Sequence, residues 1–123
     1  MTPPILVSVK SQYIEDQSEP EDARFVYGYT ITLSNEGEEA ARLISRHWII
    51  TDADGAVQEV QGMGVIGQQP RIAPGDTYTY TSGVVLATET GTMSGSYQML
   101  TDSGAAFDAD IPEFLLIPPR ALH

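Results

Sequence analysis

Apolar and polar residues alternate along much of this chain, and the alternation is clearest over residues 23–34. Successive residues of a strand point to opposite faces of a sheet, so a period of two indicates a strand with one buried face. Residues 23–34 are therefore predicted to form a long central strand. One face of this strand is uniformly large and apolar, and comprises Phe25, Tyr27, Tyr29, Ile31 and Leu33.

The same pattern predicts strands at residues 5–14, 77–86, 92–100 and about 105–111. Turn-forming residues, mainly glycine, aspartate and asparagine, separate most of these segments. Pro112 is expected either to place the last segment at the edge of a sheet or to break it before residues 114–117, because proline lacks a backbone N–H.

A hairpin is predicted in the middle of the chain. Residues 43–51 are rich in β-branched and aromatic side chains and include Trp48, which is expected to anchor the core. Residues 52–55 (Asp-Ala-Asp-Gly) suit a turn, and residues 56–60 return as the partner strand. Residues 62–76, with their glycines and prolines, are expected to be an irregular connection.

No window of a dozen residues shows helical spacing of apolar positions without an interrupting glycine or proline. About seven short strands joined by turns predict an all-β fold: an immunoglobulin/fibronectin type III-like antiparallel β-sandwich. A small closed barrel is the alternative architecture. With no composition shift or repeat along its 123 residues, the chain is predicted to be a single domain over residues 1–123.

Composition narrows the functional classes. The chain has no cysteine, which excludes disulfides, cysteine-ligated zinc and a thiol nucleophile. The first ten residues lack the pattern of a signal peptide, and no apolar run approaches the ~20 residues that span a bilayer. A cytoplasmic protein is expected. The net charge of −11 argues against nucleic acid and anionic membrane surfaces as partners.

Gly62, Gly64 and Gly67 match the spacing G-x-G-x-x-G of dinucleotide-binding loops. That motif requires a following helix, and Pro70 makes one improbable here. Two interpretations remain. The glycines either permit an unusual loop path, or their backbone amides form a nest that holds a phosphate group. Arg71, beyond the loop, and Arg46 are candidates to add positive charge to such an anion site.

Arg46 and His47 lie in the middle of a predicted strand. Arg46 shares the core-facing parity of Trp48, so it is expected either to pair with an acid at the sheet's rim or to be turned outward by a bulge. His47 faces the other way, as does Ser45. Residues two apart on a strand are separated by ~6.6 Å, which is too far for a Ser–His pair.

No catalytic residues, cofactor or metal site are predicted. The second histidine, His123, is the last residue of the chain. Asp52 and Asp54 share a turn, which offers weak Mg²⁺ or Ca²⁺ ligation, but turn chemistry alone explains both residues.

Several motifs together resemble the ApaG family of small bacterial proteins. The most specific are Ser45-Arg46-His47-Trp48 and the run over residues 62–70. Others are Gln17-Ser18-Glu19-Pro20, Asn35-Glu36-Gly37, Ile72-Ala73-Pro74-Gly75 and the segment over residues 91–97. The resemblance implies an immunoglobulin/fibronectin-type sandwich. It also implies a genetic link to diadenosine tetraphosphate hydrolysis and to Co²⁺/Mg²⁺ resistance or efflux, which gave the name CorD. Eukaryotic relatives carry the domain as an interaction module.

Two main functional hypotheses follow. The first is a non-enzymatic binding module that contacts an unidentified protein partner. The alternative is a sensor of phosphate, pyrophosphate or a nucleotide that uses the loop over residues 62–67. A phosphohydrolase is a third, weaker hypothesis, because no catalytic set is identifiable. Open sheet edges are also compatible with a homodimer, formed by edge pairing or by face packing.

Overall fold

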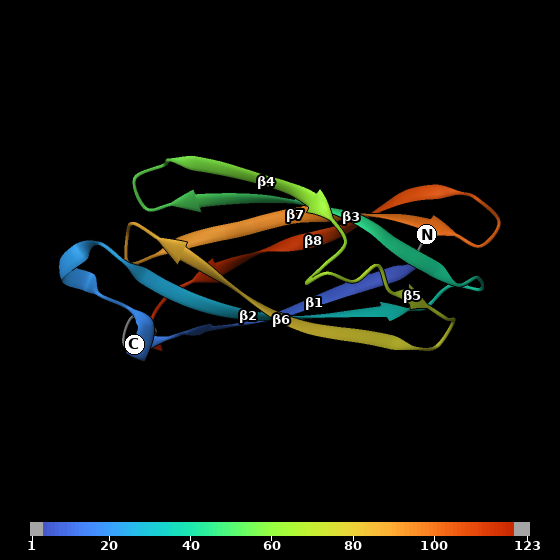
Figure 1. The fold of residues 1–123 in the computed structure, drawn as a ribbon, viewed down its shortest axis with the longest axis horizontal. Coiled ribbons are helices and arrows are strands. Elements are labelled where there is room, and N and C mark those ends of the chain that lie inside the picture. Colours follow the sequence, from blue (N-terminus) through green and yellow to red (C-terminus); the bar gives the residue numbers. More distant parts are fainter. Residues whose placement is uncertain (1–3, 120–123) are drawn as a thin grey trace.

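The structure, a computed structural model, describes residues 4–119. Two antiparallel sheets face each other across one apolar core (Figure 1), which confirms the all-β sandwich. The finer immunoglobulin/fibronectin likeness stays a prediction. The strands are β1 (Ile5–Tyr13), β2 (Phe25–Asn35), β3 (Ala41–Asp52), β4 (Val57–Met63), β5 (Arg71–Ile72), β6 (Thr77–Leu86), β7 (Gly91–Thr101) and β8 (Ala106–Leu116).

The three-stranded sheet has the order β1-β2-β6, and the five-stranded sheet has the order β4-β3-β7-β8 with β5 paired to β3. The connection after β4 is thus less irregular than expected, because β4 extends to Met63 and β5 adds a short strand. The acidic connector between β1 and β2 holds two 3-10 turns, η1 (Glu15–Gln17) and η2 (Pro20–Asp22).

Pro112 lies inside β8 rather than ending it. The register between β7 and β8 shifts here, since Gly95 faces Ile111 while Met93 faces Phe114. One extra residue on β8 forms a bulge, and β8 is an edge strand, so the missing N–H of proline leaves no ladder bond unmade. The expected edge position is confirmed, and the expected break does not occur.

Trp48 is buried between the sheets, as expected. Its ring meets those of Tyr29, Tyr97 and Phe114, with centroids 5.3, 6.3 and 6.1 Å away. Tyr29 comes from the three-stranded sheet, and the other two come from β7 and β8 of the opposite sheet. One aromatic cluster therefore joins the two layers.

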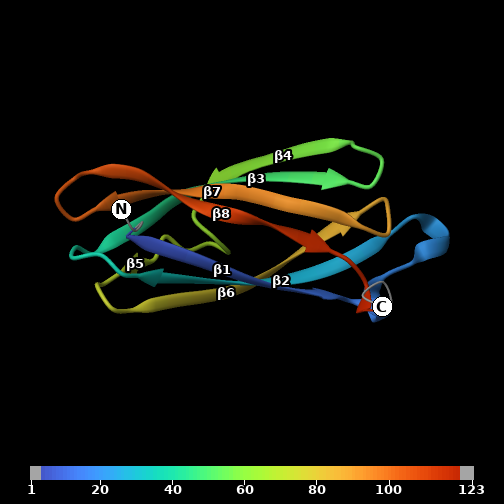
Figure 2. The ribbon, with the colours of Figure 1, turned by 180° about the vertical axis from the view of Figure 1, so that it is seen from behind.

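The two long sides of the sandwich differ. On one side β1 runs beside β8, as Figure 2 shows, and the Ser11 hydroxyl donates to the Leu115 carbonyl at 3.1 Å. The other side has β4 and β6 as its edges, and an open groove of about 370 Å³ lies between them. Within residues 4–119, none of the helical segments is long and apolar enough to cross a membrane.

Candidate functional site

A bulge in β3 sets the geometry of the site. The register between β3 and β7 shifts between Leu43, which faces Met99, and Ser45, which faces Gln98. The extra residue reverses the parity of the strand, so that Leu43 and Trp48 are both buried although one number is odd and the other even. Arg46 consequently lies on the inner side of β3 together with Trp48.

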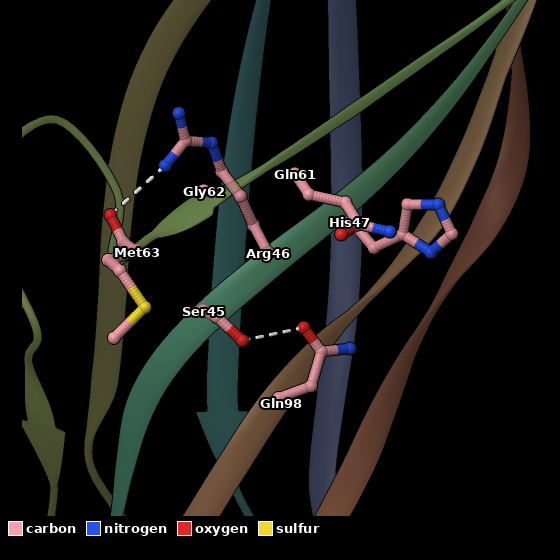
Figure 3. Close-up of a pocket in the computed structure, with 7 residues that line it drawn as sticks. All are labelled: Ser45, Arg46, His47, Gln61, Gly62, Met63 and Gln98. Atoms are coloured by element: carbon pink, nitrogen blue, oxygen red, sulfur yellow. Dashed lines mark hydrogen bonds between the residues drawn. The ribbon is translucent and has the colours of Figure 1, made fainter.

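Arg46 reaches the rim of the sheet and holds the start of the glycine loop. Its Nη1 donates to the carbonyl of Met63 at 3.1 Å and to that of Gly64 at 2.8 Å. Figure 3 shows the guanidinium turned toward Met63. The rim position is confirmed, but the expected acidic partner is wrong, because two main-chain carbonyls take its place. A Cβ atom at Gly62 would lie 2.9 Å from both Nη atoms, so a side chain there would require the guanidinium to shift.

Main-chain hydrogen bonds hold the glycine loop, residues 62–67, in place. The Gly64 amide donates to the Ile44 carbonyl at 2.8 Å, and Val65 and Gln68 exchange two bonds of 2.8 Å. Gly64 has φ +62°, and a Cβ there would lie 2.2 Å from the Gln68 carbonyl oxygen. The amides of Gly64 and Val65 are thus used inside the fold, and no helix follows Gly67.

Ile66, at the tip of this loop, has an unusual conformation. Its φ is +41°, in the left-handed region that a β-branched residue rarely enters. Its side chain is 60% exposed, whereas the preceding Val65 is only 1% exposed. Met63, where β4 enters the loop, is 67% exposed. Two large apolar side chains are therefore presented to solvent beside a buried anchor.

An open pocket of about 570 Å³ lies where β4 meets the loop. It is lined by Ser45, Arg46, His47, Gln61, Gly62, Met63 and Gln98, drawn in Figure 3. The Ser45 hydroxyl donates to Gln98 Oε1 at 2.8 Å, and His47 Nε2 lies 3.0 Å from Glu59 Oε1. Both polar groups are thus engaged on the outer face of the sheet and not with each other.

The structure brings together half of the predicted site residues. Arg46, His47 and Gly62 line this one pocket, while Gly64, Gly67 and Arg71 do not. Gly64 lies in the adjoining loop, and Gly67 at the loop's turn has open space around the position of a Cβ.

Arg71 is engaged elsewhere, on β5. Its guanidinium donates to both carboxylate oxygens of Asp102, at 3.0 and 2.5 Å. The hydrogen bond from Arg71 lowers the pKa of Asp102, and the same bond raises the pKa of Arg71. The pair is exposed, so it contributes little to stability.

Sequence reasoning missed Ile66 and Gln98 as members of this region. Ile66 carried a weak signal, since a β-branched residue stands next to Gly67 in a glycine-rich loop. Gln98 carried none, because only the pairing of β3 with β7 places it beside Ser45. Over residues 4–119, no group of three or more His, Asp or Glu side chains is arranged to hold a metal ion. His123 lies outside the described residues.

Comparisons with known proteins agree with this architecture. The sequence is 60% identical over 117 residues to Protein ApaG of Pseudomonas aeruginosa strain LESB58, covering 95% of this chain and 93% of the relative. It is 56% identical over 119 residues to Protein ApaG of Thiobacillus denitrificans, covering 97% and 94%. The crystal structure of the putative ApaA protein from Bordetella pertussis superposes with a TM-score of 0.92 at 49% identity, covering 94% of each chain.

An X-ray structure of a structural-genomics target also matches with a TM-score of 0.92, at 53% identity, covering 98% of this chain and 91% of the other. The family description "ApaG domain" matches residues 15–101, which contain β2 to β7 and the whole candidate site. The resemblance drawn from the sequence motifs is confirmed: the chain belongs to the ApaG family.

Proposed function

We propose that this chain is a protein-binding module whose contact surface is the pocket together with the loop tip. We call this the loop surface and define it as Arg46, His47, Gln61, Met63 and Ile66. The observation that carries the proposal is Ile66, whose backbone is strained and whose side chain is exposed.

Two features of Ile66 are each unfavourable to the free energy of folding. The left-handed conformation costs an L-residue roughly 1–2 kcal/mol, and leaving a large apolar side chain in water forgoes the gain from burial. Strain of this kind gathers at functional sites, where surrounding structure holds it in place. Here two features supply that support: the β-bridge between Val65 and Gln68, and the hydrogen bond from Arg46 to the Gly64 carbonyl.

The chemistry of the loop surface suits a protein partner. Methionine and arginine are enriched at the centres of protein interfaces, and exposed apolar groups beside polar ones are typical of contact sites. Met63 and Ile66 would provide apolar contact, while Gln61 and His47 would provide hydrogen bonds at its margin. We place this binding in the cytoplasm, as the composition predicts.

Comparative affinity capture tests the proposal. Wild-type protein, Ile66→Gly and Leu115→Gln are each used as bait in lysate from the source cells. Ile66→Gly relieves the strain while removing the side chain. Leu115 is an equally exposed apolar residue on β8, remote from the loop, and serves as the matched control. A specific partner should bind wild type and Leu115→Gln but not Ile66→Gly. Equal capture by all three baits would contradict the loop surface.

Phosphate sensing is a second candidate, and one arrangement favours it. Arg46 and His47 line the same pocket as Gly62, and in the adjoining loop, outside the pocket, the amides of Ile66 and Gly67 have no hydrogen-bond partner among residues 4–119. The resemblance-based link to diadenosine polyphosphates and to Co²⁺/Mg²⁺ resistance belongs to this candidate. Backbone amide spectra should shift at residues 66 and 67 when pyrophosphate or a dinucleoside polyphosphate is added. Unmoved amides would exclude the candidate.

A further inference from the structure

The outer edge of β4 is unpartnered within residues 4–119, because β4 pairs only with β3. Antiparallel pairs alternate between those that exchange hydrogen bonds and those that do not. The Gly64 amide bonds to Ile44 and the Asp52 amide bonds to Ala56, so the bonded positions of β4 are the even-numbered ones. The backbone N–H and C=O groups of the odd-numbered residues therefore point away from β3: Val57, Glu59, Gln61 and Met63.

Apart from the Arg46 guanidinium at the Met63 carbonyl, this edge lacks the usual protection against pairing. Free edges are normally blocked by lysine, proline or several charges. Over its seven residues β4 has one charged side chain, Glu59, in a chain of net charge −11. Its ends carry Val57 and Met63, 62% and 67% exposed, the two most exposed large apolar side chains among residues 4–119. The edge is thus suited to pairing with a strand that has apolar residues at both ends and little charge between them.

A second copy of β4 meets those requirements in one register. Antiparallel self-pairing centred on Val60 sets Val57 opposite Met63 of the other copy and Glu59 opposite Gln61. All seven residues are then paired, and every outward N–H and C=O faces an outward group; the Met63 carbonyl accepts from the other copy in addition to Arg46. A shift of one residue would set outward groups against inward ones. A shift of two toward Val57 would place Glu59 opposite Glu59, which like-charge repulsion disfavours.

We propose that two copies of this chain associate through antiparallel pairing of their β4 edges, with Val60 at the two-fold axis. The two five-stranded sheets then form one continuous sheet. Val57 of each copy lies beside Met63 of the other, so that these exposed apolar side chains cover each other. Such an interface is isologous, as a two-fold dimer requires. The proposed interface shares Gln61 and Met63 with the loop surface but does not use Ile66, which lies outside β4.

The small interface and the net charge of each chain determine how the dimer should respond to protein and salt concentration. Seven residues from each copy are far fewer than the roughly 20–30 a side of a standard interface, so the dimer should be weak and dependent on concentration. Two chains of charge −11 repel each other, and salt screens that repulsion. Light scattering should therefore show a dimer fraction that rises with both protein and salt concentration.

Cysteine cross-linking tests the register, because the native chain has no cysteine. Val57→Cys and Met63→Cys are made separately, with tags of different mass, and mixed under mild oxidation. Opposed residues in a hydrogen-bonded pair have Cα atoms ~5.5 Å apart, within disulfide range. Each variant alone would need to bridge ~20 Å along the strand. The mixture should form a heterodisulfide, and each variant alone should not. Homodisulfides, or no heterodisulfide, would overturn the register.

Substitutions at Gln61 supply a second test that does not touch the core. Gln61→Glu places a negative charge opposite Glu59 of the other copy in two symmetric pairs, and Gln61→Lys places a positive charge there. The dissociation constant should rise roughly 2- to 30-fold for Gln61→Glu and fall by a similar factor for Gln61→Lys. Equal constants for the three proteins, or the reverse order, would overturn the proposal.

Discussion

The hydroxyl groups of Tyr80 and Tyr97 meet inside the core at 2.5 Å, one from each sheet. Both side chains are buried, and each hydroxyl satisfies the other. Because Tyr97 also packs edge-on against Trp48, this polar contact lies within the aromatic cluster that joins the layers. The pair therefore joins the two sheets by a buried polar contact within a mostly apolar interior.

Breaking this pair from one side should cost more than replacing both partners. Tyr97→Phe leaves the Tyr80 hydroxyl buried without a partner, which should lower the free energy of unfolding by about 1–3 kcal/mol. The double variant Tyr80→Phe/Tyr97→Phe removes both polar groups and should recover part of that loss. Urea unfolding of the two single variants and the double variant measures the coupling. Strictly additive losses would contradict the mutual satisfaction of the pair.

Alkaline pH should destabilise the protein through the same residues. Burial raises the pKa of Tyr80 to about 12 and also raises the pKa of Tyr97, whereas an unfolded tyrosine titrates near 10. The unfolded chain therefore loses these protons first. The stability that these two tyrosines contribute should be constant below about pH 10 and fall as the pH rises toward 12. Unfolding measured against pH should show a shallower fall for Tyr80→Phe/Tyr97→Phe, and an identical slope would contradict the assignment.

Two glycines of the loop should differ sharply in their tolerance of a methyl group. Gly67→Ala faces only the cost of a left-handed φ, about 1 kcal/mol, because nothing lies near its Cβ position. Gly64→Ala adds a clash with the Gln68 carbonyl oxygen, only 2.2 Å away. Its loss in free energy of unfolding should be clearly larger. Equal losses for the two variants would show that the loop adapts freely.

Arg46 should contribute more to stability than Arg71, although Arg71 forms an ion pair and Arg46 bonds only to main-chain carbonyls. Arg46→Met leaves the carbonyls of Met63 and Gly64 without their charged donor and should cost about 1–3 kcal/mol. Arg71→Met removes only an exposed pair with Asp102 and should leave the melting temperature nearly unchanged. Thermal unfolding of both variants checks the order, and the reverse order would be inconsistent with Arg46 holding the loop.

The strands were predictable because their signal is local. A period of two placed the strand at residues 77–86, the same bounds as β6, and placed the long central strand within two residues of β2. The bulge after Leu43 was not predictable, since it exists only in the register with β7. For the same reason, the parity of Arg46 indicated its rim position but not its carbonyl partners.

The loop tip shows a second limit of local reasoning. Intrinsic preference places glycine, not isoleucine, at positive φ. Ile66 adopts it because Val65 is drawn into the core and closes a bridge with Gln68, and both constraints come from tertiary contacts. The motif spacing of Gly62, Gly64 and Gly67 thus located the loop, while its conformation followed from the fold around it.

The most direct test of the central claim is the free energy of unfolding of Ile66→Gly against wild type in urea. If the Ile66 side chain serves a partner and not the fold, relief of strain should offset the added chain entropy of glycine, and stability should change by less than about 1 kcal/mol. A loss well above 2 kcal/mol, typical of removing a packed core side chain, would contradict the claim.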